Sequence, residues 1–383
     1  MSIQIDSKEA LIAAITFSVM GVFAMMTGPI YIGSLMDHLQ FDFAQASLIL
    51  SVEYLGIALA SICAAFWLNR LSWQVAAAIA VSVVIAGNIV SGMQTSPDVL
   101  AVIRFLVGFL GEGTAFVIGI AVISSTSDQQ RNFGFVIASQ VSFGVLAMLV
   151  LPKIIAQMGF GGIMYPLAGL ALLFALAIKW MPSGGVAPDP AAAEAGAEKA
   201  SAVPALIVLL AMFVWCTGLG SIWNFVERIA VEGGLTSENA AYAISVSTAC
   251  AIAGGVIAAS LGNRFGSLFP VAVALFVQMV MIYLLQGEMS WWQFAATAAV
   301  FQIFWNITGP FLMGAVAMND PSGRISVMIP AAQIGGLFLG VAVTGQLIAE
   351  QGLGAANQVA IVCCIAALLI FAPIALKGSK QAA

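Results

Sequence analysis

Residues 182–201 read PSGGVAPDPAAAEAGAEKAS, and this stretch divides the chain into two parts. It has no aromatic residue and one branched apolar residue, Val186, so it can neither span a membrane nor build a packed core. The rest is strongly apolar, since the whole chain of 383 residues is 62% hydrophobic and only 8% charged. This balance excludes a water-soluble protein. We therefore expect residues 182–202 to be a linker between two membrane-embedded halves, residues 1–181 and 203–383.

Apolar stretches of about 20 residues recur on both sides of the linker, each long enough to cross a hydrocarbon core of ~30 Å. Six precede the linker and six follow it. They cover residues 9–37, 44–67, 72–93, 98–125, 133–156, 163–181, 203–228, 237–260, 268–286, 291–318, 325–350 and 355–376. The sequence thus predicts an all-α polytopic membrane protein with twelve transmembrane helices in two six-helix halves.

Lysine and arginine are distributed unequally across this topology. Nine of the twelve fall on the side that holds both termini, where membrane proteins carry the cytoplasmic excess of these residues. They are Lys8, Arg70, Arg131, Lys179, Lys199, Arg264, Arg324, Lys377 and Lys380. Both termini are therefore expected in the cytoplasm, and the short loops favour a bacterial inner membrane.

A reporter fused after Ser201 or at Ala383 is expected to give a cytoplasmic signal, because both positions lie on the side rich in lysine and arginine. Paired fusions to a reporter active only in the cytoplasm and to one active only in the periplasm would measure this. A periplasmic signal at either position would overturn the topology.

The two halves resemble each other at a shift of about 194 residues, as a duplicated unit would. One match lies after the second span and after the eighth span. Another lies at the start of the fifth span and of the eleventh span. The matched residues are Asn69-Arg70 with Asn263-Arg264, and Arg131 and Gln140 with Arg324 and Gln333. Their common order along the chain supports duplication of a six-helix unit.

Two six-helix halves with a short basic turn after the second and eighth spans resemble the major facilitator superfamily over the whole chain. That family's turn reads roughly G-x-x-x-D-R-x-G-R-R, and Gly262-Asn263-Arg264-Phe265-Gly266 is a fair match. The first copy, Leu68-Asn69-Arg70-Leu71-Ser72, matches less well. Asparagine stands at the acidic position in both copies. The resemblance therefore implies that Arg70 and Arg264 cap the inward gate, and it does not support a charge relay there.

The fourth span opens with Arg104-Phe105-Leu106-Val107-Gly108-Phe109-Leu110-Gly111, which is similar to the family's R-x-x-x-G-x-x-G motif. Helical spacing would place Gly108 and Gly111 on the face of Arg104, where a neighbouring backbone can approach closely. We therefore count both glycines among the gating residues. The fifth span lacks the G-P-x-x-G-G motif of drug antiporters, which argues against a multidrug exporter.

Three ionisable residues lie deep inside predicted spans, where a charge costs ~2.5–3.5 kcal/mol on insertion scales. Glu53 and Arg104 lie at depths of about 13 and 9 Å, so they could pair. In the functional interpretation Glu53 accepts a proton and Arg104 tunes its affinity, with Glu112 as an alternative proton site bordering the same cavity. Arg104 could instead hold a substrate carboxylate. The structural alternative is a permanent ion pair that braces two helices.

Neutral polar residues supply further candidates for solute binding. Gln140 and Gln333 occupy equivalent depths in the two halves, so pseudo-symmetry would place them across a central cavity. Interhelical hydrogen bonding is the alternative. Two Gly-Pro pairs, Gly28-Pro29 and Gly309-Pro310, are expected to break the first and tenth spans.

Two tryptophan-asparagine pairs, Trp223-Asn224 and Trp305-Asn306, lie in the seventh and tenth spans. Such a pair suits a ring-bearing or partly apolar solute, although interfacial anchoring would also explain Trp223. Glu227-Arg228 ends the seventh span, and we interpret this pair as solvated rim residues or as an outer gate.

The sequence predicts a secondary transporter that moves a small organic solute, with an organic anion as one class, by alternating access coupled to protons. The alternatives are an uncoupled facilitator, a drug or metabolite exporter of the same fold, a membrane-embedded enzyme and a non-transporting sensor. There is no phosphate-cradling loop and only one histidine, and all five cysteines lie inside predicted spans. We therefore expect no enzyme, cofactor, metal or nucleic-acid partner, and a monomer in contact with the solute, protons and membrane lipid.

Overall fold

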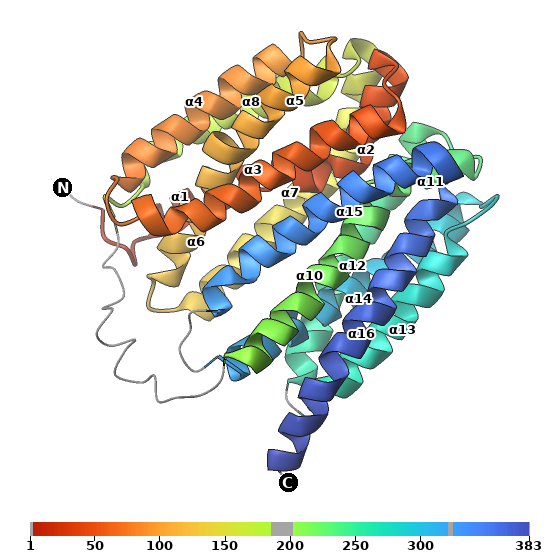
Figure 1. The fold of residues 1–383 in the computed structure, drawn as a ribbon. Helices are drawn as coiled ribbons and strands as arrows, with labels where there is room; N and C mark the ends of the chain where they lie inside the picture. The colour runs from red at the N-terminus through yellow and green to blue at the C-terminus, as the bar shows by residue number, and fades with distance from the viewer. Residues whose placement is uncertain (1–2, 185–201, 263, 321–324, 383) are drawn as a thin grey trace. The chain divides into compact units, whose positions relative to one another are not determined.

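The computed structural model describes residues 3–184, 202–262, 264–320 and 325–382. In this part of the chain eleven helices are long and apolar enough to cross a membrane, and Leu268–Leu284 is a shorter apolar helix of 17 residues. The prediction of an all-α protein with twelve spans is confirmed (Figure 1). Of the predicted features, linker residues 185–201 with Lys199, as well as Asn263 and Arg324, lie outside the described residues.

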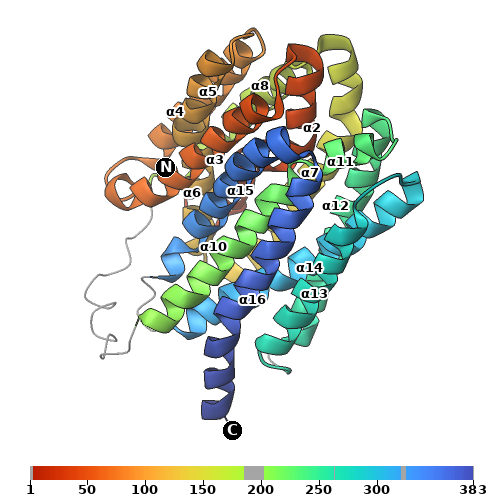
Figure 2. The same cartoon turned by 45° about the vertical axis from the view of Figure 1, so that its right-hand side comes forward.

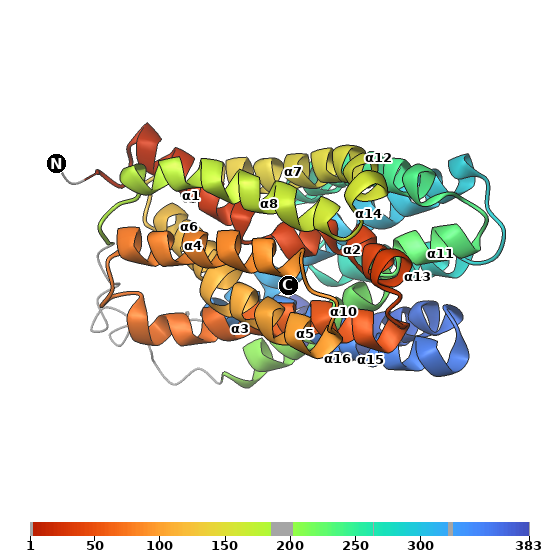
Figure 3. The ribbon, with the colours of Figure 1, turned by 90° about the horizontal axis from the view of Figure 1, so that it is seen from above.

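The chain separates into two compact units, Met1–Ala187 and Pro188–Ala383. In the first unit α4 lies beside α8, and α3 lies beside α5 (Figure 3). Its helices are α1 (Lys8–Met20), α2 (Phe23–Leu39), α3 (Phe43–Trp67), α4 (Trp73–Ser91), α5 (Pro97–Leu106), the π-helical η1 (Val107–Glu112), α6 (Gly113–Ser124), α7 (Gln129–Met158), α8 (Gly161–Phe174) and the 3₁₀ segment η2 (Ala175–Trp180).

The second unit is built in the same manner. There α10 lies beside α15 and α16, and α12 lies beside α14 (Figure 2). Its helices are α10 (Val203–Trp223), α11 (Val226–Glu232), α12 (Ser237–Leu261), α13 (Leu268–Leu284), α14 (Trp291–Met318), the 3₁₀ segment η3 (Ser326–Met328), α15 (Ile329–Gln351) and α16 (Gly354–Ala382).

Polar side chains at the loop ends determine where several helices begin. The Asp42 side chain accepts a hydrogen bond from the backbone of Gln45, whose side chain returns one, and Ser290 and Gln293 repeat this capping box at the start of α14. Within the helices the backbone satisfies its own hydrogen bonds, which is what a lipid environment requires.

The first span is interrupted at residues 21–22, between α1 and α2, and not at Gly28-Pro29. The Gly-Pro pairs lie inside α2 and α14 instead, so the predicted break positions are wrong. The interruption coincides with a close contact between helices, since a Cβ added at Gly21 would lie 2.5 Å from the Cβ of Phe116 and 2.7 Å from its backbone. The first span is therefore interrupted at its close approach to α6 and not at its proline, which α2 accommodates.

The fourth span contains the π-helical segment η1, which changes how its glycines face their neighbours. A Cβ on Gly108 would meet the carbonyl oxygen of Glu53 in α3, whereas a Cβ on Gly111 would meet Val84 in α4. The expectation that both glycines share one face is therefore wrong. The reason is that i→i+5 hydrogen bonding lets each residue turn less around the axis than in an α-helix.

Candidate functional site

Arg104 and Glu53 form a two-point ion pair between α5 and α3. The Arg104 Nε donates to Glu53 Oε2 at 3.0 Å, and its Nη2 contacts Glu53 Oε1. Both residues have 0% of their surface exposed. The pairing predicted from their similar depths is thus present, and the planar guanidinium meets the carboxylate in its bidentate geometry.

Glu112 joins the same cluster from the end of η1. Its Oε1 lies 3.6 Å from Arg104 Nη2, and its Oε2 accepts a hydrogen bond of 3.2 Å from the backbone N–H of Ala24. Glu112 was expected to border a water-filled cavity, yet it is also 0% exposed. The π-helical turn between Arg104 and Glu112 alters their relative phase around the helix, and both side chains turn inward onto one cluster.

Residues that were not predicted from the sequence surround this cluster. Arg104 Nη1 donates to Asn88 Oδ1 of α4 at 2.5 Å, and its Cζ lies 5.9 Å from the ring centroid of Tyr31 in α2. Ser91, also in α4, lies 3.5 Å from Nη1. Asn88 and Ser91 are fully buried. Asn88 is the one asparagine of the apolar stretch 72–93 and lies 14 residues beyond Gln74 at its start, and such an amide deep in a span is the signal that could have found it.

The formal charges of this cluster do not balance when both carboxylates are ionised, since Glu53 and Glu112 face one guanidinium. The N-terminus of α2 carries a partial positive charge, and Ala24, whose N–H donates to Glu112, is the second residue of this helix. The helix N-terminus therefore offsets part of the excess negative charge. A single proton would make the cluster neutral. The arrangement therefore contains the elements of a proton-binding site that is screened from solvent.

Gln140 serves the backbone of the first span rather than an open cavity. Its Nε2 donates to the carbonyl oxygen of Ser18 in α1 at 3.1 Å. Its counterpart Gln333 lies half-buried in α15. For Gln140 the hydrogen-bonding alternative is thus the one that the geometry of the first unit displays.

The aromatic residues predicted for the seventh and tenth spans meet in the second unit. Trp223 and Trp305 lie edge to face with centroids 5.7 Å apart, and Phe301 lies 6.0 Å from Trp305. The adjacent amides bond within their own helices, as Asn224 donates to the Gly220 carbonyl and Asn306 to the Gln302 carbonyl, each at 3.0 Å. The tryptophans thus come together and form an aromatic cluster.

A buried polar bridge that was not predicted from the sequence joins three helices of the same unit. Gln278 in α13 accepts a hydrogen bond of 3.1 Å from Trp215 Nε1 and donates one of 2.8 Å to Thr308 Oγ1. All three residues are buried. This bridge fixes α10 and α14 against α13.

The predicted gating residues occupy different environments. Arg70 and Arg264 are exposed in the turns after α3 and α12. Glu227 and Arg228 pair with each other, with Arg228 Nε 2.6 Å from Glu227 Oε2, and are 0% and 8% exposed. The interpretation as solvated rim residues is therefore wrong, because the pair lies inside the packed protein.

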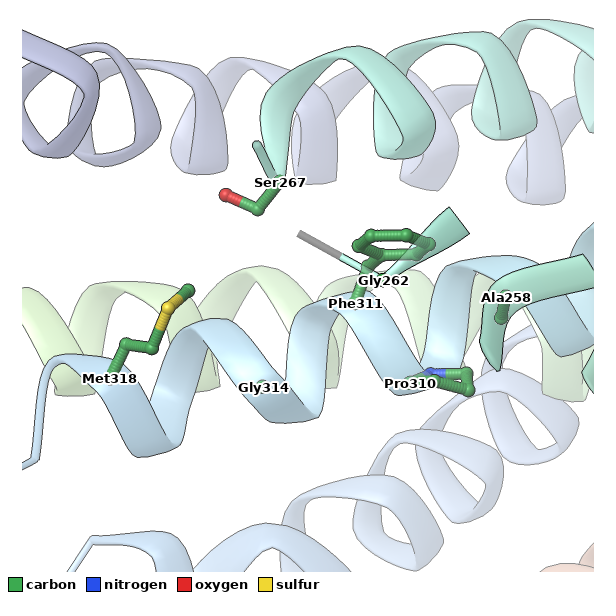
Figure 4. A pocket seen from close by; sticks show the side chains of 7 residues that line it. All are labelled: Ala258, Gly262, Ser267, Pro310, Phe311, Gly314 and Met318. Atoms are coloured by element: carbon green, nitrogen blue, oxygen red, sulfur yellow. The ribbon is translucent and has the colours of Figure 1, made fainter. Parts of the chain in front are cut away.

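A cavity of about 240 Å³ lies between α12, α13 and α14 (Figure 4). It is lined by Ala258, Gly262, Ser267, Pro310, Phe311, Gly314 and Met318. Ser267 has the only polar side chain of this set, so the lining offers no charged group to a solute. Over the described ranges, there is also no group of three or more histidine, cysteine, aspartate or glutamate side chains that could hold a metal.

Comparisons with known proteins place these features in context. A family model described as Major Facilitator Superfamily matches residues 12–343. A mutant of the nucleoside transporter NupG has a similar structure, with a TM-score of 0.73 and 14% identity over 97% of this chain and 99% of that one. No curated protein sequence matches the chain.

Two solved peptide-transporter structures are similar as well. One is reported under substrate recognition in proton dependent oligopeptide transporters, with a TM-score of 0.71 and 14% identity over 96% of this chain and 99% of that one. The other is an auto-inhibited POT family peptide transporter, with a TM-score of 0.69 and 14% identity over 97% of each chain. At this identity the likeness concerns the fold.

Proposed function

The chain belongs to the major facilitator superfamily, and from this premise we propose that it is a proton-coupled secondary transporter of a small organic solute. The proposal includes alternating access, a monomeric state and a bacterial inner membrane with both termini in the cytoplasm. It is supported by one observation above all, the buried cluster in which two carboxylates share one guanidinium. Such groups inside a membrane protein commonly serve ion or proton pathways.

Within this cluster we assign the exchangeable proton to Glu112 and make Glu53 the fixed partner of Arg104. Glu53 receives two contacts from the guanidinium of Arg104. Glu112 Oε1 lies 3.6 Å from Arg104 Nη2 and has no hydrogen-bond partner among the described residues. A proton on Glu112 leaves a neutral, paired Glu53 and Arg104. The sequence alone had favoured Glu53 for this role.

For the solute we propose a ring-bearing organic molecule, with the aromatic cluster of Trp223, Trp305 and Phe301 as part of its site. Tryptophan offers a large apolar face with a polar edge. Gln333, Asn224 and Asn306 remain candidates for hydrogen bonds to the solute. Arg104 is engaged by Glu53 and Asn88, so an organic anion would have to displace one of them to bind it.

Reconstitution into liposomes tests the proposal. Labelled nucleosides, short peptides and organic anions would be offered with and without an inward proton gradient, and one class is expected to accumulate only with the gradient. One pH unit supports up to about tenfold accumulation per proton, because it equals 1.36 kcal/mol. Equal uptake with and without the gradient would indicate an uncoupled facilitator.

Glu112→Gln is expected to lose this accumulation while still exchanging solute across a membrane at equal pH. Glutamine keeps the size and a hydrogen-bond acceptor but binds no proton, and exchange needs no net proton movement. Glu238→Gln, at an exposed carboxylate, is the matched control and should behave as the parent does. If Glu112→Gln accumulates solute as well as the parent, Glu112 is not the proton site and Glu53→Gln becomes the next test.

A further inference from the structure

The interruption of the first span is slight. Gly21 keeps a helical conformation with φ −69° and ψ −6°, and Val22 departs from it with φ −118° and ψ 16°. Neither residue has a positive φ, so the interruption places no residue in the left-handed region. Joining α1 and α2 into one helix requires the backbone angles of both Gly21 and Val22 to move to α-helical values, without a change to positive φ at either residue.

Two side chains from other spans form hydrogen bonds with backbone groups that lose their helical partners at the interruption. In a continuous α-helix the Val22 N–H would donate to the Ser18 carbonyl, and the Ala24 N–H to the Met20 carbonyl. Here the Val22 N–H donates to the Val19 carbonyl at 3.2 Å.

The Ser18 carbonyl instead accepts from Gln140 Nε2, at 3.1 Å, and the Ala24 N–H donates to Glu112 Oε2, at 3.2 Å. A side chain from α7 and one from η1 therefore each hold one side of the interruption. Closing it would return both backbone groups to the helix and release both side chains.

We propose that Glu112 and Gln140 are positioning residues that hold the first span in its interrupted form, and that a proton on Glu112 lets the span close into one continuous helix. This rests on the proton site of the proposed function. No covalent bond other than the new O–H forms, and the Ala24 N–H moves from Glu112 to the Met20 carbonyl.

The negative charge of Glu112 is what stabilises the interrupted form of the first span. A hydrogen bond to a carboxylate is roughly twice as strong as one between neutral groups, and the anion is also attracted by the N-terminus of α2. Both attractions weaken on protonation. The Met20 carbonyl, which is the partner in a continuous helix, is unaffected by the proton.

The groups around Glu112 come from several helices. The titratable and charged groups that face it are Arg104 from α5, Glu53 from α3 and Tyr31 from α2. On α4 the cluster has only neutral polar residues, Asn88 and Ser91. Because Arg104 stays paired with Glu53, a proton on Glu112 changes the contact with α2 and leaves that ion pair in place.

The conformation of Val22 is a direct readout that needs no solute. Labelling the valine carbonyl with ¹³C and the phenylalanine nitrogen with ¹⁵N selects the two Val-Phe pairs of this sequence, Val22-Phe23 and Val300-Phe301. Val300 lies inside the continuous helix α14 and serves as an internal control. The full-length protein in lipid bilayers would be studied by solid-state NMR in acidic and alkaline buffer.

Acidification is expected to move the Val22 carbonyl resonance to its helical value and to leave Val300 unchanged. In Glu112→Gln the Val22 resonance should be helical at every pH, and in Gln140→Leu its midpoint should shift to higher pH. Glu238→Gln should follow the parent. A Val22 resonance that does not respond to pH in the parent overturns the proposal, whether or not the variants fold.

A pH response that persists unchanged in Glu112→Gln overturns it too, because another group would then be titrating. The outcome is separable from the transport test. If solute uptake proves independent of the proton gradient while Val22 still follows the protonation of Glu112, proton coupling fails and the positioning role stands.

Discussion

Replacing Arg104 by glutamine is expected to abolish transport and to reduce sharply the yield of folded protein. The change would leave Glu53 and Glu112 together in a fully buried site without their shared cation. Removing one partner of a buried ion pair typically costs about 3–5 kcal/mol, which is a large fraction of a protein's stability. The yield of monodisperse protein in detergent and its melting temperature would measure the loss.

A double variant separates charge from packing. Glu53→Gln combined with Arg104→Gln removes one charge of each sign and is expected to recover much of the yield without restoring transport. Arg104→Lys keeps the charge but loses the planar fork that meets Glu53 at two points, so we expect an intermediate yield. If the double variant folds no better than Arg104→Gln alone, the ion pair is not what the single change disrupts.

Gly108→Leu is the second change for which we expect a large effect. Any Cβ at this position would overlap the carbonyl oxygen of Glu53, and a backbone atom of α3 cannot move aside as a flexible side chain can. Overpacking of this kind costs about 1–3 kcal/mol and sometimes more. We therefore expect a clear fall in melting temperature and, because Glu53 itself is displaced, a loss of proton-driven uptake.

Gly169→Ala is the matched control for this prediction. Gly169 lies in α8, and an added Cβ there would have no atom within 4 Å, so the variant should be as stable as the parent or slightly more stable. Gly254 in α12, whose Cβ would meet the Ile303 carbonyl of α14, should be as intolerant as Gly108. A Gly108→Leu variant with the parent's melting temperature would show that α3 and η1 do not pack this closely.

The close packing at Gly108 and the ion pair at Glu53 belong to one arrangement. Glu53 takes part in both: its backbone carbonyl lies against Gly108, and its carboxylate binds Arg104. Arg104 precedes Gly108 by four positions on the fourth span. The fourth span is thus fixed to α3 through backbone contact and through charge at the same point. This explains why changes at either residue are expected to affect both stability and coupling.

Several features followed from the sequence because they depend on quantities that a sequence states directly. The length of an apolar stretch determines whether a helix can cross a membrane, and lipid requires that the backbone bond to itself, so twelve helices could be predicted. The pairing of Glu53 with Arg104 followed from their depths in two spans, because isolated charges there are costly.

Other features depended on how the helices pack, which no local pattern states. The interruption at Gly21 and Val22 arises where α6 approaches α1, and the two Gly-Pro pairs that looked like breaks lie within intact helices. Asn88 gave no periodic signal, and it acquires its role only because α4 places it beside Arg104. The sequence by itself thus determined the helices and their principal ion pair. The tertiary structure alone decided where the first span is interrupted and which side chains hold it, because those depend on contacts between residues up to 122 positions apart.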